Sequence, residues 1–334
     1  MAGIKALRKI QLGKEASTDH DAGVAATTIW RGMGTLEDLS EYTVPEEAIG
    51  LMVESDRLYC AKALAAITFE EVEATFEQLP HIFEAGIMLA TPTTDTGTGS
   101  GYIYTYNWPT TSQPTIRYYT IEGGDDQQEE ESPYFYVEEF SLKGEGGAAV
   151  MVSANWKGRQ IAPSTFTGAL SAPTVEDILF SKGKLYIDVD TDAFGTTQKT
   201  LTLLDFELNA KTGLMPVWTA DGAIYYSFVK GVGPEVSLKV TFEHDTIGVA
   251  EKAAWRAKTM RGIQLKFEGT ALTSAGAYTY RTLIINLAGK WEKFDKIGEK
   301  DGNDVLQGTL RGKYSTNRST MGSIIVVSDQ VSLP

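Results

Sequence analysis

Three groups of polar residues have types and spacings that enzymes or metal sites use. The first contains Asp95-Thr96-Gly97, the triplet that aspartic proteases carry on two loops whose carboxylates share a proton. Here Thr93 and Thr94 precede the aspartate, where the protease loop needs apolar residues, and the sequence holds no second triplet. We therefore expect the triplet to lie in a polar loop.

The second group is Asp188, Asp190 and Asp192, which alternate like the first calcium ligands of an EF-hand loop. That loop requires Gly at its sixth position and Glu at its twelfth, where this chain has Ala193 and Lys199. The surrounding residues alternate as in a β-strand. These carboxylates are therefore expected on a solvated strand face.

The third group is the three histidines, His20, His81 and His244. None has a second His three to five residues away, so the spacing of a zinc site is missing. Asp21 and Asp245 adjoin two of them and could orient a general base, but no Ser or Cys lies in a nucleophile motif such as Gly-x-Ser-x-Gly. We expect surface or capping roles for the histidines. The sequence thus predicts no enzyme, no metal site and no cofactor.

The net negative charge of the chain comes entirely from one half. Of 334 residues, 30 are Lys or Arg and 44 are Asp or Glu, a net charge of −14. Residues 1–170 hold 11 basic and 25 acidic side chains, whereas residues 171–334 hold 19 of each. An acidic surface repels the phosphates of a duplex, so sequence-specific DNA binding is not expected.

The rest of the composition excludes other classes. The single cysteine, Cys60, excludes an internal disulfide and a Cys-based zinc site. No apolar run approaches the ~20 residues of a membrane span. Residues 1–15 lack the continuous apolar segment of a signal peptide. We expect a folded protein that is made and assembled in a cytoplasm, with no membrane partner.

Two segments carry helix signals, whereas most of the remaining chain alternates with period two, as strands do. The first helix is expected from Thr68 to Pro80, with Glu71 completing a capping box. The second is expected from Thr246 to Ala257.

Two turns are indicated by Asp-Gly pairs. Asp221-Gly222 lies between alternating apolar residues over 217–226, which is typical of a hairpin with a two-residue type I′ turn. The second pair is in Lys300-Asp301-Gly302-Asn303. Both turns are expected to join neighbouring antiparallel strands.

Short sequence patterns occur in the same order in both halves. The matching pairs are Gly50-Leu51-Met52 with Gly213-Leu214-Met215, Ile67-Thr68-Phe69-Glu70 with Val240-Thr241-Phe242-Glu243, Phe76 with Trp255, Val137-Glu138-Glu139-Phe140 with Trp291-Glu292-Lys293-Phe294, and Gly144-Glu145 with Gly298-Glu299. Their offsets drift, as insertions and deletions in loops would cause. We predict an internal duplication with its boundary in residues 162–173, giving two domains, 1–170 and 171–334.

These features together resemble a known family. The succession of Thr212-Gly213-Leu214-Met215, an Asp-Gly turn, a Thr-Phe-Glu strand end, an acidic-capped helix and the strand at 261–269 is similar to siphophage tail tube (major tail) proteins. The likeness is strongest over residues 201–327 and extends through the internal repeat to residues 28–160. It implies a mainly β fold of two tandem tail-tube-type β-sandwich or barrel domains, each with one principal α-helix.

The resemblance also implies a function. In that family six tube domains form a ring around a channel, rings stack into the phage tail, and genomic DNA passes through the lumen without specific binding. Two domains per chain imply a virion ring of three chains, with tape measure, tail terminator and distal tail proteins as partners at the tube ends. Type VI secretion tubes share the fold but suit single-domain chains better. A two-domain β-sandwich adhesin or carbohydrate-binding protein is the alternative from another class, because six Trp and 15 Tyr side chains can stack on sugars.

Long connections are the expected contacts between rings or subunits, since loops on a rigid scaffold carry function. These are residues 36–56, 91–113 and 125–132, and their candidate assembly residues are Glu46, Glu47, Thr93, Asp95, Asp125, Asp126, Glu129 and Glu130. The acidic run in the third is either a solvated loop or a repulsive surface with a positional role. Deleting residues 93–112 is expected to leave the monomer folded but prevent tubes. The channel wall is expected to be neutral or negative, because Lys and Arg would hold DNA through counterion release.

Overall fold

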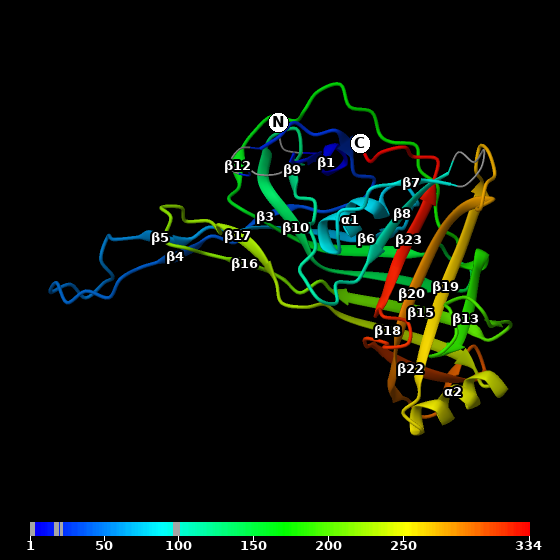
Figure 1. Ribbon diagram of the computed structural model, residues 1–334. Coiled ribbons are helices and arrows are strands. Elements are labelled where there is room, and N and C mark those ends of the chain that lie inside the picture. Colours follow the sequence, from blue (N-terminus) through cyan, green and yellow to red (C-terminus); the bar gives the residue numbers. More distant parts are fainter. Residues whose placement is uncertain (1–3, 17–19, 21–22, 96–100) are drawn as a thin grey trace.

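Strands dominate the computed structural model of the chain (Figure 1), which describes residues 4–16, 20, 23–95 and 101–334. They hold 49% of the residues, whereas the two α-helices and short helical turns of the described part hold 8%. The strands form a large antiparallel sheet, and the predicted mainly β fold is confirmed.

The first half contains twelve strands and one α-helix in its described residues. They are β1 (Lys9–Lys14), β2 (Thr28–Ile29), β3 (Leu36–Asp38), β4 (Glu41–Thr43), β5 (Tyr59–Lys62), β6 (Ala65–Glu73), α1 (Leu79–Gly86), β7 (Thr93–Thr94), β8 (Tyr102–Asn107), β9 (Tyr119–Gly124), β10 (Glu129–Glu145), β11 (Met151–Gly158) and β12 (Ala162–Pro163), after a 3-10 turn, η1, at Lys5–Leu7.

The second half continues with eleven strands and the second α-helix. They are β13 (Gly183–Val189), β14 (Gln198–Lys199), β15 (Leu203–Lys211), β16 (Leu214–Val217), β17 (Phe228–Gly231), β18 (Glu235–Glu243), α2 (Thr246–Arg256), β19 (Met260–Ala271), β20 (Tyr280–Phe294), β21 (Gly298–Lys300), β22 (Asn303–Gly312) and β23 (Gly322–Ser328), after a 3-10 turn, η2, at Phe180–Lys182.

The two halves use the same order of strand pairing. In the first half the neighbours run β1, β9, β10, β11, β6 and β3. In the second they run β13, β19, β20, β22, β18 and β15. Strands that hold the same place in this pairing order also follow one another in the same order along the chain. The hairpin β4–β5 likewise corresponds to the hairpin β16–β17, and α1 corresponds to α2. Strands β7 and β8 have no such counterpart in the second half, nor has β21 among the described residues of the first.

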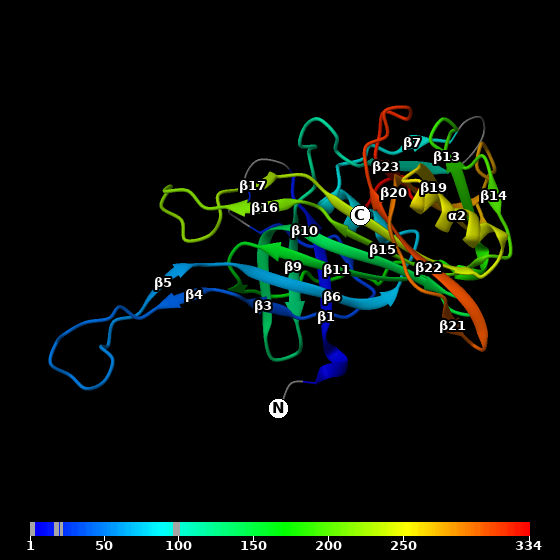
Figure 2. The ribbon, with the colours of Figure 1, turned by 90° about the horizontal axis from the view of Figure 1, so that it is seen from below.

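The halves are joined edge to edge within continuous sheet (Figure 2). Residues 139–145 of β10 pair with residues 205–211 of β15 on one side, and residues 136–143 pair with β11 on the other. Strand β23, near the end of the chain, pairs antiparallel with β8 of the first half. One cluster of buried apolar side chains spans both halves. The division into two domains at residue 170 therefore stays a prediction.

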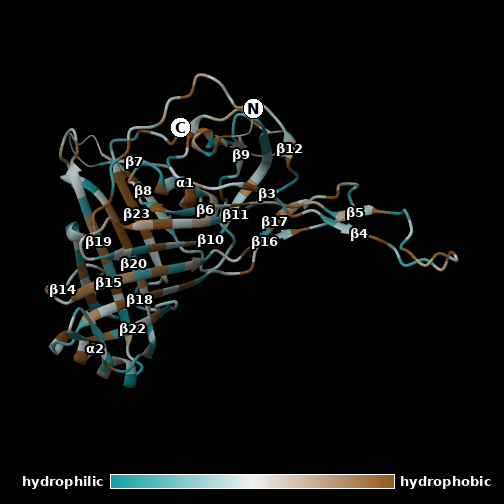
Figure 3. Cartoon of the chain, turned by 180° about the vertical axis from the view of Figure 1, so that it is seen from behind, coloured by the Kyte–Doolittle hydropathy of each residue, from teal (hydrophilic) through white to brown (hydrophobic). Residues whose placement is uncertain are grey.

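Alternation along the strands builds the core, and Figure 3 displays it as alternating hydrophobic and hydrophilic bands. In β11 every second side chain is buried, including Trp156, whose ring lies 5.2 Å from Phe69 and 5.8 Å from Tyr119 between centroids. Burying one such aromatic stabilises the fold by roughly 1.5–3 kcal/mol. Helix α1 lies inside this core, with all eight residues buried.

The first predicted helix is wrong, because residues 65–73 form strand β6. Ile67 and Phe69 are buried, and Thr68 between them is exposed and hydrogen-bonds Asn155 on β11 at 2.9 Å. β-Branched and aromatic side chains on this two-residue period favour a strand over the capping box. The helix begins only at Leu79, with Pro80 in its first turn, where a missing N–H costs nothing.

The second predicted helix is confirmed as α2. Asp245 is its N-cap, and its Oδ1 accepts the N–H of Gly248 at 2.8 Å. This bond satisfies one of the amides that a helix start leaves without an intrahelical partner.

One predicted turn is confirmed and the other is wrong in detail. Asp301 and Gly302 have φ of 53° and 83° between the paired residues Lys300 and Asn303, as a type I′ turn requires. The strands β16 and β17 form a hairpin, but the ladder ends at Val217, and residues 218–227 form a longer loop. The Asp221 carboxylate organises that loop by accepting the hydroxyls of Thr219 and Ser227 at 2.8 and 2.5 Å.

Candidate assembly surface

Two long hairpins project from the same side of the molecule (Figure 1). We call residues 39–64, with β4 and β5, arm 1, and residues 212–234, with β16 and β17, arm 2. Arm 1 begins where the N–H of Leu39 donates to the carbonyl of Leu64 at 2.8 Å. Because the arms link corresponding strand pairs in the two halves, they occupy equivalent places in the repeated order.

The tip of arm 1 exposes apolar side chains. Met52 is fully exposed, and Val53 and Leu51 expose 74% and 62% of their surface. Other large apolar side chains exposed along the arm are Tyr42, Val44, Ile49, Leu58 and Tyr59. Scattered single apolar side chains are the ordinary case on a protein surface, whereas a concentration of this kind is typical of interaction surfaces, so the tip of arm 1 is a candidate for one.

Arm 2 supports arm 1 near its base. The N–H of Ala63 donates to the carbonyl of Ile224 at 2.9 Å, and Lys62 Nζ lies 4.1 Å from the centre of the Trp218 ring. These contacts hold the two hairpins side by side, as both views of the ribbon show (Figures 1 and 2).

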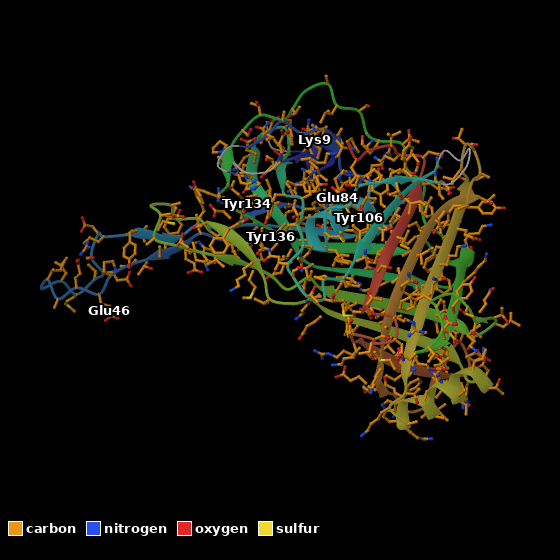
Figure 4. The ribbon with its side chains drawn as sticks, viewed as in Figure 1. Lys9, Glu46, Glu84, Tyr106, Tyr134 and Tyr136 are labelled. Carbon is orange, nitrogen blue, oxygen red and sulfur yellow. The ribbon has the colours of Figure 1, made fainter. Side chains whose placement is uncertain are left out.

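A buried arginine fixes arm 2 to the first half. Arg159 Nε donates to the carbonyl of Tyr226 and Nη2 donates to that of Ser227, both at 3.0 Å, while Nη1 donates to the carbonyl of His20 at 3.1 Å. Its guanidinium also lies 4.5 Å from the centre of the Tyr134 ring. Figure 4 places Tyr134 and Tyr136 at this junction between arm and body. The arm of the second half is therefore anchored on residues of the first half.

Glu46 and Glu47, two of the predicted assembly residues, lie in arm 1. Glu46 is exposed and far from the body of the molecule (Figure 4). Glu47 forms an ion pair with Arg57 across the tip loop. Glu46 is therefore available at the apolar tip, whereas Glu47 is held by Arg57, and the role of both in assembly stays a prediction.

Thr93 and Asp95, the next two, are in different environments. Thr93 is exposed in β7, but Asp95 is buried and accepts the N–H groups of Ala277 at 2.8 Å and Tyr278 at 3.1 Å. Asp95 thus holds the connection between β19 and β20. The other residues of its Asp-Thr-Gly triplet lie outside the described residues.

The prediction of a long loop over residues 91–113 is wrong at its centre. Residues 102–107 form β8, which pairs with β23, and Tyr104 and Tyr106 are buried in the core. Tyr106 contacts Phe83 of α1, with ring centres 5.4 Å apart. A deletion of residues 93–112 would remove these core aromatics, so we now expect that deletion to destabilise the monomer rather than leave it folded.

The acidic run forms the β9–β10 turn and the first residues of β10. The Asp125 Oδ1 accepts the N–H groups of Gln127 and Gln128, at 2.9 and 3.2 Å. Asp126 accepts the N–H of Ile4 at 3.0 Å. Glu129 accepts the N–H of Phe166 at 2.8 Å, and Glu130 lies opposite Pro163 of β12. These four residues therefore order local backbone as well as carrying charge.

The Asp188 group is not the solvated strand face that the pattern predicts. Asp188 is buried and accepts the N–H groups of Gly195, Thr196 and Thr197, at 2.9, 3.3 and 2.6 Å. Asp190 forms an ion pair with Arg318 at 3.0 Å. Both carboxylates therefore stabilise turns and strand ends, which the alternating sequence pattern does not indicate.

The expected surface or capping role holds for one histidine. His244 is exposed beside the N-cap of α2. His20 is buried, stacks on Tyr134 with centroids 4.0 Å apart, and its Nδ1 contacts the Glu15 carboxylate. His81 is buried in α1 with its Nδ1 3.0 Å from the Tyr119 hydroxyl. Burial lowers the pKa of His81 to about 3.

A buried charged cluster beside α1 carries no sequence signal. Burial raises the pKa of the Glu84 carboxyl to about 7, against the opposing effect of Arg117 and Lys14. Arg117 Nε lies 3.9 Å from the Glu84 carboxylate, and burial lowers the pKa of Lys14. These residues come from a helix, a loop and β1, so only the fold brings them together.

Within the described residues, no group of three or more His, Cys, Asp or Glu side chains is arranged to hold a metal ion. No helix in that part of the chain is both long and apolar enough to span a membrane. The sequence matches no protein-family model and no curated protein.

Proposed function

We propose that this chain is a structural subunit of a bacteriophage tail tube, forming stacked rings around a channel for genome passage. The observation that carries the proposal is the repeated strand order, in which each half sends one hairpin arm from the same position. A chain built this way supplies two similar ring-forming units. Three chains then complete a pseudo-hexameric ring in the virion, assembled in the host cytoplasm.

The arms support stacking of one ring on the next. They project together, and arm 1 ends in exposed apolar side chains beside the exposed Glu46 and the Glu47–Arg57 ion pair. Burying about 300 Å² of apolar surface at each contact is worth roughly 7 kcal/mol before the entropic costs of association. Terminator, tape measure and distal tail proteins are the proposed partners at the tube ends.

The net negative charge of the chain is suited to a channel through which DNA passes rather than to a DNA-binding site. The excess of acidic residues lies in the first half, and the second half is neutral. Like charges keep DNA away from the channel wall over about a Debye length, roughly 8–10 Å in physiological salt. DNA therefore passes without specific binding in this proposal.

Electron microscopy of the purified full-length protein tests the proposal. We expect annular cross-sections and filaments, with native mass spectrometry giving three chains for each ring. Monomers at all concentrations would contradict the tube, and sugar binding by such monomers would favour the adhesin alternative. Six chains per ring would keep the tube but defeat the three-chain count.

A further inference from the structure

The join between the two halves pairs two strand edges that each have a counterpart elsewhere in the chain. Strand β10 corresponds to β20, and β15 corresponds to β3, by the repeated pairing order. Inside the chain, β10 and β15 pair over seven residue pairs, from Glu139–Lys211 to Glu145–Asp205. The corresponding edges of β20 and β3 are therefore candidates for the same kind of pairing.

In the described residues, both edges lack a strand on the relevant side. Strand β3 pairs with β6 alone. Strand β19 leaves β20 at Lys290, and beyond that point β20 and β21 pair with β22 on their other side only. The N–H of Asp295 donates to the carbonyl of Gln307 of β22 at 2.9 Å, so the link between β20 and β21 also stays beside β22. An open strand edge presents unpaired backbone groups and is a template for another strand.

The carbonyl of Glu292 accepts the indole N–H of Trp255 at 3.2 Å, so the open part of the β20 edge begins at Lys293. We propose that this edge of one copy, residues 293–299, pairs antiparallel with the β3 edge of a second copy, residues 35–41. The pairing repeats between chains the join that β10 and β15 make within a chain. This inference deepens the proposed ring, on which it rests, by identifying the two surfaces that close it. Each chain offers one β20 edge and one β3 edge, so neighbouring chains contact head to tail. Such contacts close into a ring by rotation.

Charged residues of the two edges can pair across the contact. Residues 35–41 carry Glu37, Asp38 and Glu41 and no basic residue, and all three are exposed. The other edge presents the exposed Lys293 and Lys296 as partners for them, alongside Asp295, which pairs with Lys293 at 2.6 Å, and the exposed Glu299. Charged side chains often protect an edge from pairing, but β10 carries Glu139, Lys143 and Glu145 in its join and is nonetheless paired. The charges here thus favour one partner rather than none.

Charge reversal tests the pairing. Glu37→Lys with Asp38→Lys alters one edge, and Lys293→Glu with Lys296→Glu alters the other. We expect each double variant to need at least a tenfold higher protein concentration for half-maximal ring formation in sedimentation. The fourfold variant restores the opposite charges and is expected to recover most of that loss. Glu70→Lys with Glu73→Lys on β6 makes the same charge change away from both edges and is the matched control.

A direct measurement uses isotopically light and heavy copies of the unaltered chain. A zero-length carbodiimide joins neighbouring carboxylates and amines, and we expect mixed light–heavy cross-links between residues 37–41 and residues 293–296. If rings form but the double variants match the control, or these mixed cross-links are missing, the inference is wrong and the proposed tube stands. If the unaltered chain forms no ring, both are wrong.

Discussion

Glu138 and Glu292 occupy equivalent β-bulges, each with an equivalent basic partner. The register of β10 against β11 shifts between Val137 and Glu139, and that of β20 against β22 shifts between Trp291 and Lys293. Glu138 lies 3.9 Å from Lys157, and Glu292 lies 3.8 Å from Arg311. All these residues correspond at one offset in the sequence, so an irregular feature and its ion pair recur together in both halves.

The bulges predict a contrast between deletions inside and outside them. Glu138→Ala should change the free energy of unfolding by less than about 0.5 kcal/mol, because exposed ion pairs contribute little. Deleting Glu138 removes the extra residue, so Val137 and Glu139 become neighbours opposite Trp156 and Asn155 and Phe140 keeps its face. Deleting Ser141, in the regular part of the ladder, shifts the strand by one position and turns Leu142 to the opposite face, and we expect a loss of more than about 3 kcal/mol in urea unfolding. A Glu138 deletion as costly as the Ser141 deletion would contradict the role assigned to the bulge.

The tip of arm 1 should control stacking without affecting folding. Leu51→Asp with Met52→Asp places charge on side chains that are already exposed, so the unfolding temperature of the monomer should stay within about 2 °C. Filaments should shorten to single rings in electron micrographs, because apolar contacts between rings are lost. Leu201→Asp, at an equally exposed site in the connection before β15, is the control and should leave filaments intact. Full-length filaments from the tip variant would exclude this surface from stacking.

Arg159 should determine how firmly arm 2 is held. Arg159→Lys keeps the charge but loses the planar fork that reaches the carbonyls of Tyr226 and Ser227. We expect a loss of about 2 kcal/mol in stability and faster amide exchange over residues 217–231, read by mass spectrometry. Arg57→Lys, on the exposed tip of arm 1, is the comparison and should leave exchange in arm 2 unchanged. Equal exchange in both variants would remove Arg159 as the anchor.

Period-two alternation and the Asp301-Gly302 turn depend on neighbouring residues, and these parts of the fold could be predicted from the sequence. The Asp245 cap of α2 is local in the same way. The strand at Thr68 could not be predicted in this way, because its partner Asn155 lies on a strand that is distant in the sequence. Packing against that strand outweighed the capping box.

The site residues show the same limit. Asp95 lies in a Thr- and Gly-rich segment that reads as a loop, but its carboxylate caps amides at residues 277 and 278, which are remote in the sequence. Burial of Glu84 and His81 likewise depends on strands from several parts of the chain. The arms could be anticipated only as a long connection near residues 36–56, since nothing local specifies that they project together.

His81 and Glu84 should give stability opposite dependences on pH. His81 has a pKa of about 3 in the fold against 6.5 unfolded, so its contribution is complete above pH 6.5 and is lost as the pH falls toward 3. Glu84 has a pKa of about 7 in the fold against 4.5 unfolded, so its contribution is complete below pH 4.5 and is lost as the pH rises through 7. Each proton difference is worth about 1.4 kcal/mol for each pH unit.

Between pH 4.5 and 6.5 the two slopes cancel in the unaltered chain, and single variants should reveal them. Glu84→Gln keeps the shape of the neutral acid, so its stability relative to the unaltered chain should rise with pH across this window, by up to about 3 kcal/mol at pH 7. His81→Gln removes the imidazole, so the stability advantage of the unaltered chain over this variant should shrink as the pH falls through the same window. Urea unfolding of the three proteins in steps of half a pH unit gives both differences. Because each difference isolates one group, the other shifted carboxyls, such as Glu77 and Glu176, drop out of the comparison. A Glu84→Gln difference that is flat from pH 4.5 to 7 would mean that the carboxyl is ionised beside Arg117 throughout, and that its burial is fully offset by that arginine and Lys14.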